Sequence, residues 1–194
     1  MPLGSTVRFA RRAALACAVV LTSFPIGSPL LAAHAADEAA KPDDWYEGTP
    51  PDGSFHVRAP VPFETFAQRD SGGPESKAHT QGVRASQAGA FDAVTKYVAS
   101  CVVDPDDRRK DEVRVQETLG RWAEQADFAY RRPVKTGNTP GVEFQMSDPS
   151  KTLRVRVFPA RDRVCTVLVQ WNPYAKPSEA DIDRFFASFA FAKR

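Results

Sequence analysis

Residues 153–171 read LRVRVFPARDRVCTVLVQW, and this stretch decides the fold class. In its first part apolar and charged side chains alternate, which is the period of a half-buried β-strand. We therefore expect the branched apolar residues to face a core, and Arg154 and Arg156 to face water. Residues 164–171 are almost continuously apolar, which is typical of a central strand. A loop over 159–163 would join the two strands as a hairpin.

Further strands are predicted on both sides of this hairpin along the chain. Residues 78–103 predict two strands separated near 87–89, and β-branched and aromatic side chains dominate the second. Short connections between successive strands favour antiparallel pairing. The remaining short strands are expected at 55–58, 131–135 and 142–144, and a surface loop at 68–77.

Two helices carry apolar stripes that can cover such a sheet. The first is predicted over 105–126, because Asp104 can cap it and a proline suits its first position. The second, over 179–189, begins at a pair similar to a capping box, Ser178 and Asp181. The fold class is therefore α+β, a mainly antiparallel sheet with helices packed on it. The stripes are Val115, Leu119, Trp122 and Ala126 in the first helix, and Ile182, Phe185, Phe186 and Phe189 in the second.

The first 35 residues predict an export signal. Three arginines precede the apolar run 13–21, and Ala33-His34-Ala35 provides a small-x-small cleavage site. The run is too short and too interrupted by proline to span a bilayer stably, although a membrane anchor is the alternative. Residues 36–44 predict a flexible lead, and 45–191 a single domain. We therefore expect a secreted or periplasmic protein.

The charge balance gives no reason to expect a nucleic acid or an anionic membrane as partner. The whole chain has 26 basic and 24 acidic side chains and a formal net charge of +2. Without the export signal, 23 basic side chains remain against the same 24 acidic ones. A nearly neutral domain lacks the basic excess that polyanion binding requires.

Two cysteines remain once Cys17 has left with the signal. In an oxidising compartment Cys101 and Cys165 favour one disulfide. It would close a loop of about 64 residues and stabilise the fold by about 4 kcal/mol. The alternative is two free thiols, each buried in its own strand.

Residues that commonly carry catalysis are sparse in the predicted domain. His56 and His79 are its histidines, and neither has the spacing of a metal ligand. The acids at 104–107 resemble the beginning of a calcium loop, but Arg108-Arg109-Lys110 follows where oxygen ligands are needed. The sequence contains neither the nucleophile-elbow motif nor the phosphate-binding glycine-loop motif. We therefore expect no catalytic, cofactor or metal site.

Arg154, Arg156, Arg161 and Arg163 are the candidate binding residues. On the predicted hairpin the first two share a face and the other two lie at its tip. Such a patch can bind a carboxylate, a phosphate or an acidic partner. The alternative is a solvated strand face that discourages edge pairing.

Several motifs follow one another in order: Trp45, PDGSFHV at 51–57, PVP at 60–62, GVEF at 141–144, the strand 153–158, and DRFFASF at 183–189. This order resembles the PsbP-like domain family over about 45–191, most of all in the terminal helix. The resemblance implies an antiparallel sheet with packed helices in an exported domain. Such relatives mostly act as accessory or binding subunits without known catalysis. The resemblance transfers no functional residue to this chain.

We therefore expect an exported, non-catalytic binding or accessory protein of the cell envelope, with a protein or small ligand as partner. The alternative is a small secreted hydrolase, in which His56 or His79 would activate a serine or cysteine nucleophile. Carriage of an apolar ligand is a third class, and it requires a cavity of a few hundred Å³.

Overall fold

The structure, a computed structural model, describes residues 44–69, 77–89 and 92–193. The predicted export signal over 1–35, and all but the last residue of the predicted lead over 36–44, lie outside the described residues. The described part contains two helices, α1 (Asp111–Ala123) and α2 (Glu179–Ser188), among ten strands. The strands are β1 (Tyr46–Gly48), β2 (Phe55–Ala59), β3 (Glu64–Arg69), β4 (His79–Ala88), β5 (Val94–Val103), β6 (Phe128–Thr136), β7 (Thr139–Ser147), β8 (Thr152–Ala160), β9 (Arg163–Trp171) and β10 (Ala190–Phe191).

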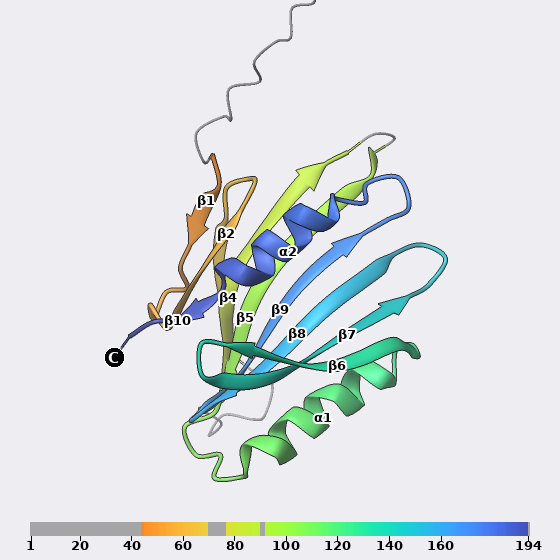
Figure 1. Cartoon of the computed structure of the whole chain (residues 1–194). Coiled ribbons are helices and arrows are strands. Elements are labelled where there is room, and N and C mark those ends of the chain that lie inside the picture. Colours follow the sequence, from red (N-terminus) through yellow and green to blue (C-terminus); the bar gives the residue numbers. More distant parts are fainter. Residues whose placement is uncertain (1–43, 70–76, 90–91, 194) are drawn as a thin grey trace, which may run out of the picture. The chain divides into compact units, whose positions relative to one another are not determined.

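The predicted hairpin forms the middle of a seven-stranded antiparallel sheet. The strand order is β3-β4-β5-β9-β8-β7-β6, so β9 is central as expected. A mainly antiparallel sheet with two helices confirms the α+β class (Figure 1). The strands of the hairpin are longer than predicted, because Ala160 pairs with Arg163 and only Arg161 and Asp162 form the turn.

One face of the main sheet is covered by α2 and a small second sheet. The second sheet has the order β1-β2-β10, and α2 contacts both β2 and β9. The apolar stripe of α2 enters this core: Ile182 and Phe185 are fully buried, and the ring of Phe185 meets Tyr97 edge-on at 5.2 Å. The sequence stripe therefore identified the buried side of α2 correctly.

The opposite face of the sheet is covered by α1. Val115 and Leu119 pack against Phe144 and the alternate residues of β8. Leu153, Val155 and Val157 are buried there, as the alternation predicts. Because β8 and its neighbours contribute side chains to both faces, the two cores share the same strands.

The beginning of α1 differs from the prediction. The helix begins at Asp111, after Lys110, and not at 105. Asp104 accepts a hydrogen bond from the Asp106 amide, and Asp107 accepts one from the Arg109 amide. Aspartates that bond backbone two residues ahead favour turns over helix, which explains the delay. The cap of α2 is as predicted, since Ser178 Oγ accepts a hydrogen bond from the Asp181 amide at 3.0 Å.

β3 lies where the sequence predicts no strand, and its end overlaps the predicted loop at 68–77. Five of its six residues are exposed, so no apolar alternation marks it. It is an edge strand whose register is set by antiparallel pairing with β4. Backbone pairing of this kind leaves little trace in side-chain pattern.

Candidate functional site

The four candidate arginines do not form one patch. Arg154 and Arg163 lie toward opposite ends of the β8–β9 hairpin, since Arg154 is six positions before Ala160, the pairing partner of Arg163. At the rise of a β-strand this separates them by roughly 20 Å. The arginines divide into two groups: Arg154 and Arg156 lie beside α2 and are ion-paired, whereas Arg161 and Arg163 lie at the hairpin turn, where only Arg163 is ion-paired.

The first group surrounds Glu143, a fully buried carboxylate on β7. Arg132, Arg154 and Arg156 approach its oxygens at 2.6, 3.0 and 2.7 Å. The hydroxyl of Tyr130 donates a further hydrogen bond at 2.9 Å. Glu143 on β7 therefore receives donors from the two strands that flank it in the sheet, β6 and β8. We call these five residues the Glu143 cluster.

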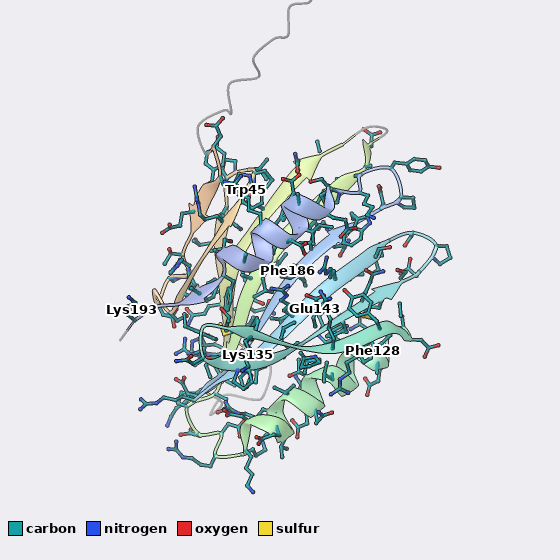
Figure 2. All side chains as sticks on the ribbon, viewed as in Figure 1. Trp45, Phe128, Lys135, Glu143, Phe186 and Lys193 are labelled. Atoms are coloured by element: carbon teal, nitrogen blue, oxygen red, sulfur yellow. A yellow bond between two sulfur atoms is a disulfide. The ribbon has the colours of Figure 1, made fainter. Side chains whose placement is uncertain are left out.

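The Glu143 cluster also contacts α2 and holds it against the sheet. Arg154 reaches Glu179 at 3.3 Å and Asp183 at 3.1 Å, both on α2. The guanidinium of Arg156 lies 4.5 Å from the centre of the Phe186 ring, a cation–π contact. Glu143 and Phe186 are labelled on this side of the sheet in Figure 2.

The expectation that Arg154 and Arg156 face water is wrong. Their side chains are only 10% and 16% exposed. The reason is that α2 covers this face of the hairpin and Glu143 supplies the carboxylate directly opposite Arg156 in the β7–β8 register. The cluster is thus a structural ion pair network.

Electrostatics keep Glu143 ionised. Burial by itself would raise the pKa of this carboxyl, but hydrogen bonds from Arg156 and Tyr130 and the nearby guanidinium charges lower it to about 2. A carboxyl with this pKa is unsuited to proton transfer near neutral pH. Glu143 therefore serves as a fixed negative charge.

The second group lies at the hairpin turn, where Asp162 lines three open hollows and Arg161 lines two of them. The hairpin hollow, about 690 Å³, extends from this turn to the residues 52–54 before β2. The helix-start hollow, about 480 Å³, lies between the turn and the residues just before α1. The strand-end hollow, about 170 Å³, is bounded by Val102 and Val164. We call this region the arginine pole, and its arginines are Arg108, Arg109, Arg114, Arg121, Arg161 and Arg163.

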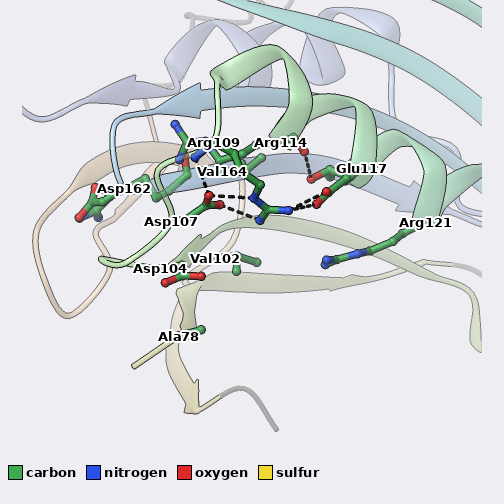
Figure 3. Close-up of a pocket in the computed structure, with 12 residues that line it drawn as sticks. Ala78, Val102, Asp104, Asp107, Arg109, Arg114, Glu117, Arg121, Asp162 and Val164 are labelled. Carbon is green, nitrogen blue, oxygen red and sulfur yellow. Dashed lines mark hydrogen bonds and ion pairs between the residues drawn. The ribbon is translucent and has the colours of Figure 1, made fainter. Parts of the chain in front are cut away.

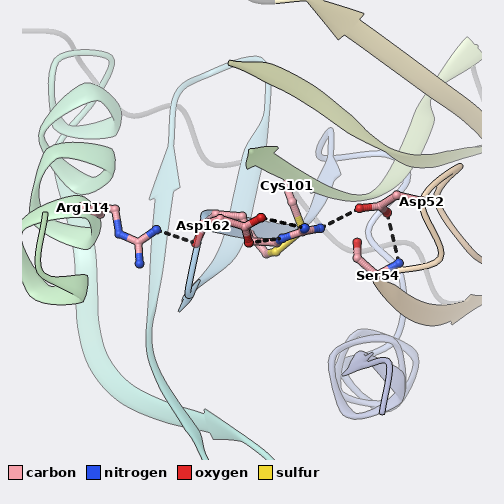
Figure 4. The surroundings of a disulfide bond; sticks show 7 residues. Asp52, Ser54, Cys101, Arg114 and Asp162 are labelled. Atoms are coloured by element: carbon pink, nitrogen blue, oxygen red, sulfur yellow. Dashed lines mark hydrogen bonds and ion pairs between the residues drawn. A yellow bond between two sulfur atoms is a disulfide. The ribbon is translucent and has the colours of Figure 1, made fainter. Parts of the chain in front are cut away.

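Arg163 connects three segments of the arginine pole through ion pairs and a hydrogen bond. Its guanidinium contacts Asp52 at 2.7 Å and Asp162 at 3.0 Å, and its backbone oxygen accepts a hydrogen bond from Arg114 (Figure 4). Partial burial opposes ionisation of Asp52, but the hydrogen bonds from the Arg163 side chain and the Ser54 backbone amide outweigh it and lower the pKa of this carboxyl. Arg163 is buried in β9, so it is not the free tip residue that the sequence predicted.

Arg109 is also fully engaged in ion pairs. Figure 3 shows it between Asp107 and Glu117, at 2.7 and 2.5 Å. The hydrogen bonds from Arg109 lower the pKa of Asp107 to about 2. These pairs stabilise the turn before α1. The carboxylates of Asp107 and Glu117 balance the charge of Arg109.

Other donors at the pole have no partner among the residues that the structure describes. Arg108 and Arg161 are exposed and pair with no described side chain. Arg114 is 4% exposed, and its Nε is buried without a hydrogen-bond partner. Ser54 Oγ, at the edge of the hairpin hollow, is the second buried side-chain atom of the described residues in this condition.

The predicted disulfide is confirmed. Cys101 and Cys165 are direct cross-strand partners on β5 and β9, with a Cα–Cα distance of 4.0 Å. Both residues are fully buried, and the bond consumes both thiols. A cysteine nucleophile activated by His56 or His79 is therefore excluded in this state.

The two histidines lie on different strands. His56 pairs with Ala190 in the small sheet, and His79 begins β4, where its Nδ1 is 3.1 Å from the Lys77 oxygen. Within residues 44–69, 77–89 and 92–193, no three His, Cys, Asp or Glu side chains are grouped to hold a metal ion. None of the helices in the same ranges combines the length and apolarity needed to cross a membrane.

Comparison with known proteins identifies no relative: no protein-family model, no curated protein and no solved structure matches this chain. The site therefore has to be interpreted from its own geometry.

Sequence reasoning missed Glu143, Arg114 and Asp52. Glu143 carries a weak signal, because a lone acid within the GVEF strand is placed opposite an arginine once β7 and β8 are paired in register. Arg114 adjoins Val115 on the apolar stripe of α1, and only the packed helix shows that it is buried. Asp52 is 111 residues from Arg163, and no local pattern connects them.

Proposed function

We propose that this chain is an exported, non-catalytic binding or accessory protein that acts through the arginine pole. A buried cross-strand disulfide supports export, because such bonds persist in oxidising compartments. The antiparallel sheet with packed helices is compatible with the PsbP-like resemblance of the sequence, and we extend that resemblance as part of the proposal. The hollows of the pole are lined by charged side chains, which favours a polar or charged partner over an apolar ligand.

One observation carries this proposal: the two residues of the described chain that contain a buried side-chain atom without a hydrogen-bond partner both lie at the pole. The two buried atoms belong to Arg114 and Ser54, and both residues line hollows of the pole, as do the unpaired Arg108 and Arg161. A buried polar group without a hydrogen bond costs about 1–3 kcal/mol. Such a cost is compensated when a bound partner supplies the acceptors, which is why functional surfaces retain it.

Site-directed photo-cross-linking in the native envelope tests this proposal. A photo-cross-linking amino acid at Thr139, which lines the hairpin hollow, should form one discrete adduct. The same group at Ser86, exposed on β4 and outside all three hollows, is the matched control and should form none. Equal adducts from both positions would contradict a role for the pole.

The hydrolase alternative is tested in parallel. Purified protein should hydrolyse neither ester nor peptide substrates above the buffer rate. Hydrolysis that is lost in both His56→Ala and His79→Ala would overturn the non-catalytic assignment.

A further inference from the structure

We infer that the helix-start hollow binds a doubly charged oxyanion, a phosphate group or a pair of carboxylates. This inference rests on the proposed function, because it names the ligand chemistry of the same pole. It depends on two arginines that have no ionic partner among the described residues, on the donors that they present, and on the backbone of the turn that holds Arg161.

Two arginines of this hollow have no ionic partner among the residues that the structure describes. Its lining contains four arginines and three aspartates. Asp107 is paired with Arg109, and Asp111 with Arg114. The third aspartate, Asp162, is paired with Arg163. Arg163 also contacts Asp52, and Arg109 also contacts Glu117. The positive charges of Arg108 and Arg161 remain without a described counter-charge.

The donors of these two arginines suit an oxyanion. A free guanidinium presents two parallel N–H groups that match the oxygens of a carboxylate or phosphate. Arg108 and Arg161 come from two different parts of the chain, the connection before α1 and the β8–β9 turn, and both line this hollow. Arg114, whose buried Nε has no partner, also lines this hollow. A dianion can engage both guanidinium groups at once, whereas a single carboxylate engages only one of them, so the two donor sets favour a dianion.

The backbone at Arg161 supports the same interpretation. Its φ is +39°, a left-handed conformation in a two-residue turn where glycine or asparagine is favoured. A side chain in this conformation costs about 1–2 kcal/mol relative to the right-handed region. The turn nevertheless holds an arginine there, directly at two hollows. The volume of about 480 Å³ accommodates an oxyanion together with part of the group that carries it.

Titration of the full chain with small anions at constant ionic strength tests this inference. The probes are inorganic phosphate at pH 8, succinate, and acetate as the monoanion control, followed by amide chemical shifts and by calorimetry. We expect phosphate or succinate to bind with shifts confined to the β8–β9 turn and the residues before α1, and acetate not to bind. Phosphate alone would indicate a phosphate group as the natural ligand, and succinate alone a pair of carboxylates.

Variants of the two unpaired arginines provide the second readout. Arg108→Ala and Arg161→Ala should each weaken dianion binding about ten- to hundredfold, as expected for loss of a charge-assisted contact. Arg161→Gly removes the same side chain while easing the backbone, so it separates loss of binding from misfolding. Arg84→Ala is the matched control, because Arg84 is an exposed arginine of β4 outside all three hollows. This variant should bind the dianion with the affinity of the parent chain.

The outcomes separate this inference from the proposed function. Equal response to acetate and phosphate, or unchanged affinity in both Arg108→Ala and Arg161→Ala, would overturn the oxyanion site. In that case the adduct at Thr139 would still support a binding pole with another ligand chemistry. Dianion binding without any adduct at Thr139 would support the oxyanion site and contradict a macromolecular partner at the pole.

Discussion

At the scale of single residues, Glu143 shows how a charge can be kept inside the fold. It is fully buried, and every group that contacts its carboxylate is a hydrogen-bond donor. Removal of one member of such a network is costly, because it leaves uncompensated buried charge on the other members.

Glu143→Gln is therefore expected to lower the free energy of unfolding by about 3–5 kcal/mol. Urea denaturation followed by circular dichroism measures this change. Glu64→Gln is the control, because Glu64 is an exposed carboxylate paired with Arg84, and it should change the value by less than about 1 kcal/mol. A decrease in the free energy of unfolding as small as that of the control would show that the Glu143 cluster does not stabilise the fold.

The same residue predicts the acid sensitivity of the fold. The folded pKa of Glu143 is about 2 and the ordinary value is 4.5. Its stabilisation is therefore fully present above about pH 4.5 and is lost as the pH falls toward 2, because the unfolded chain takes up the proton first. Denaturation at stepped pH should show this fall in the parent chain and a shallower one in Glu143→Gln. Equal pH slopes would contradict the assignment.

Replacement of Arg161 by glycine is expected to remove binding without lowering stability. Arg161→Gly relieves a left-handed conformation but increases the entropy of the unfolded chain. We expect the free energy of unfolding to stay constant or rise by up to about 1 kcal/mol, while oxyanion binding is lost. Thermal unfolding and phosphate titration of the same sample measure both. A clear loss of stability would show that the arginine side chain itself holds the turn.

At the scale of elements, the disulfide joins two central strands that already pair along their length. Cys101 and Cys165 are 64 residues apart in sequence, and α1 and the three strands β6, β7 and β8 lie between β5 and β9. The bond therefore restricts a long segment of the unfolded chain.

The double variant Cys101→Ala/Cys165→Ala should lower the free energy of unfolding by about 4 kcal/mol, with the strand pairing retained. Guanidinium denaturation measures the loss. Peptide mapping after thiol labelling provides the control: in denatured, unreduced parent protein neither cysteine should be labelled, and both should be labelled after reduction. A labelled Cys101 before reduction would contradict the bond.

At the scale of the whole described domain, the two faces of the sheet differ in how firmly they are covered. The core under α2 includes residues of two sheets, while α1 is held mainly by Val115 and Leu119. We therefore expect α1 to open before the central strands in native-state hydrogen exchange.

Leu119→Ala should speed amide exchange in α1 and leave β5 and β9 nearly as protected as before, because it removes contacts on one face only. Val113→Ala, at an exposed position of the same helix, is the matched control and should leave exchange unchanged. Uniform acceleration in the helix and the central strands would show that the two cores unfold only together.

The sequence predicted those parts of the fold that local pattern encodes. Alternation located β8, continuous apolarity located β9, and the helical stripe identified the buried side of α2. It failed at β3 and at the first turn of α1. β3 is held by backbone pairing with an exposed face, and the aspartates before α1 prefer their own backbone bonds.

What the sequence alone determined is therefore the fold class, the central hairpin and the two cysteines available for a bond, because periodicity and composition act over short distances. The tertiary structure decided which charges meet. Arg154 turned out to belong to Glu143 and α2, and Arg163 to Asp52. An arginine in a strand has the same local pattern whether it faces water or a buried carboxylate, and only the packing of distant segments against it distinguishes the two. The same packing leaves Arg108 and Arg161 unpaired at one hollow, which makes the arginine pole the candidate site.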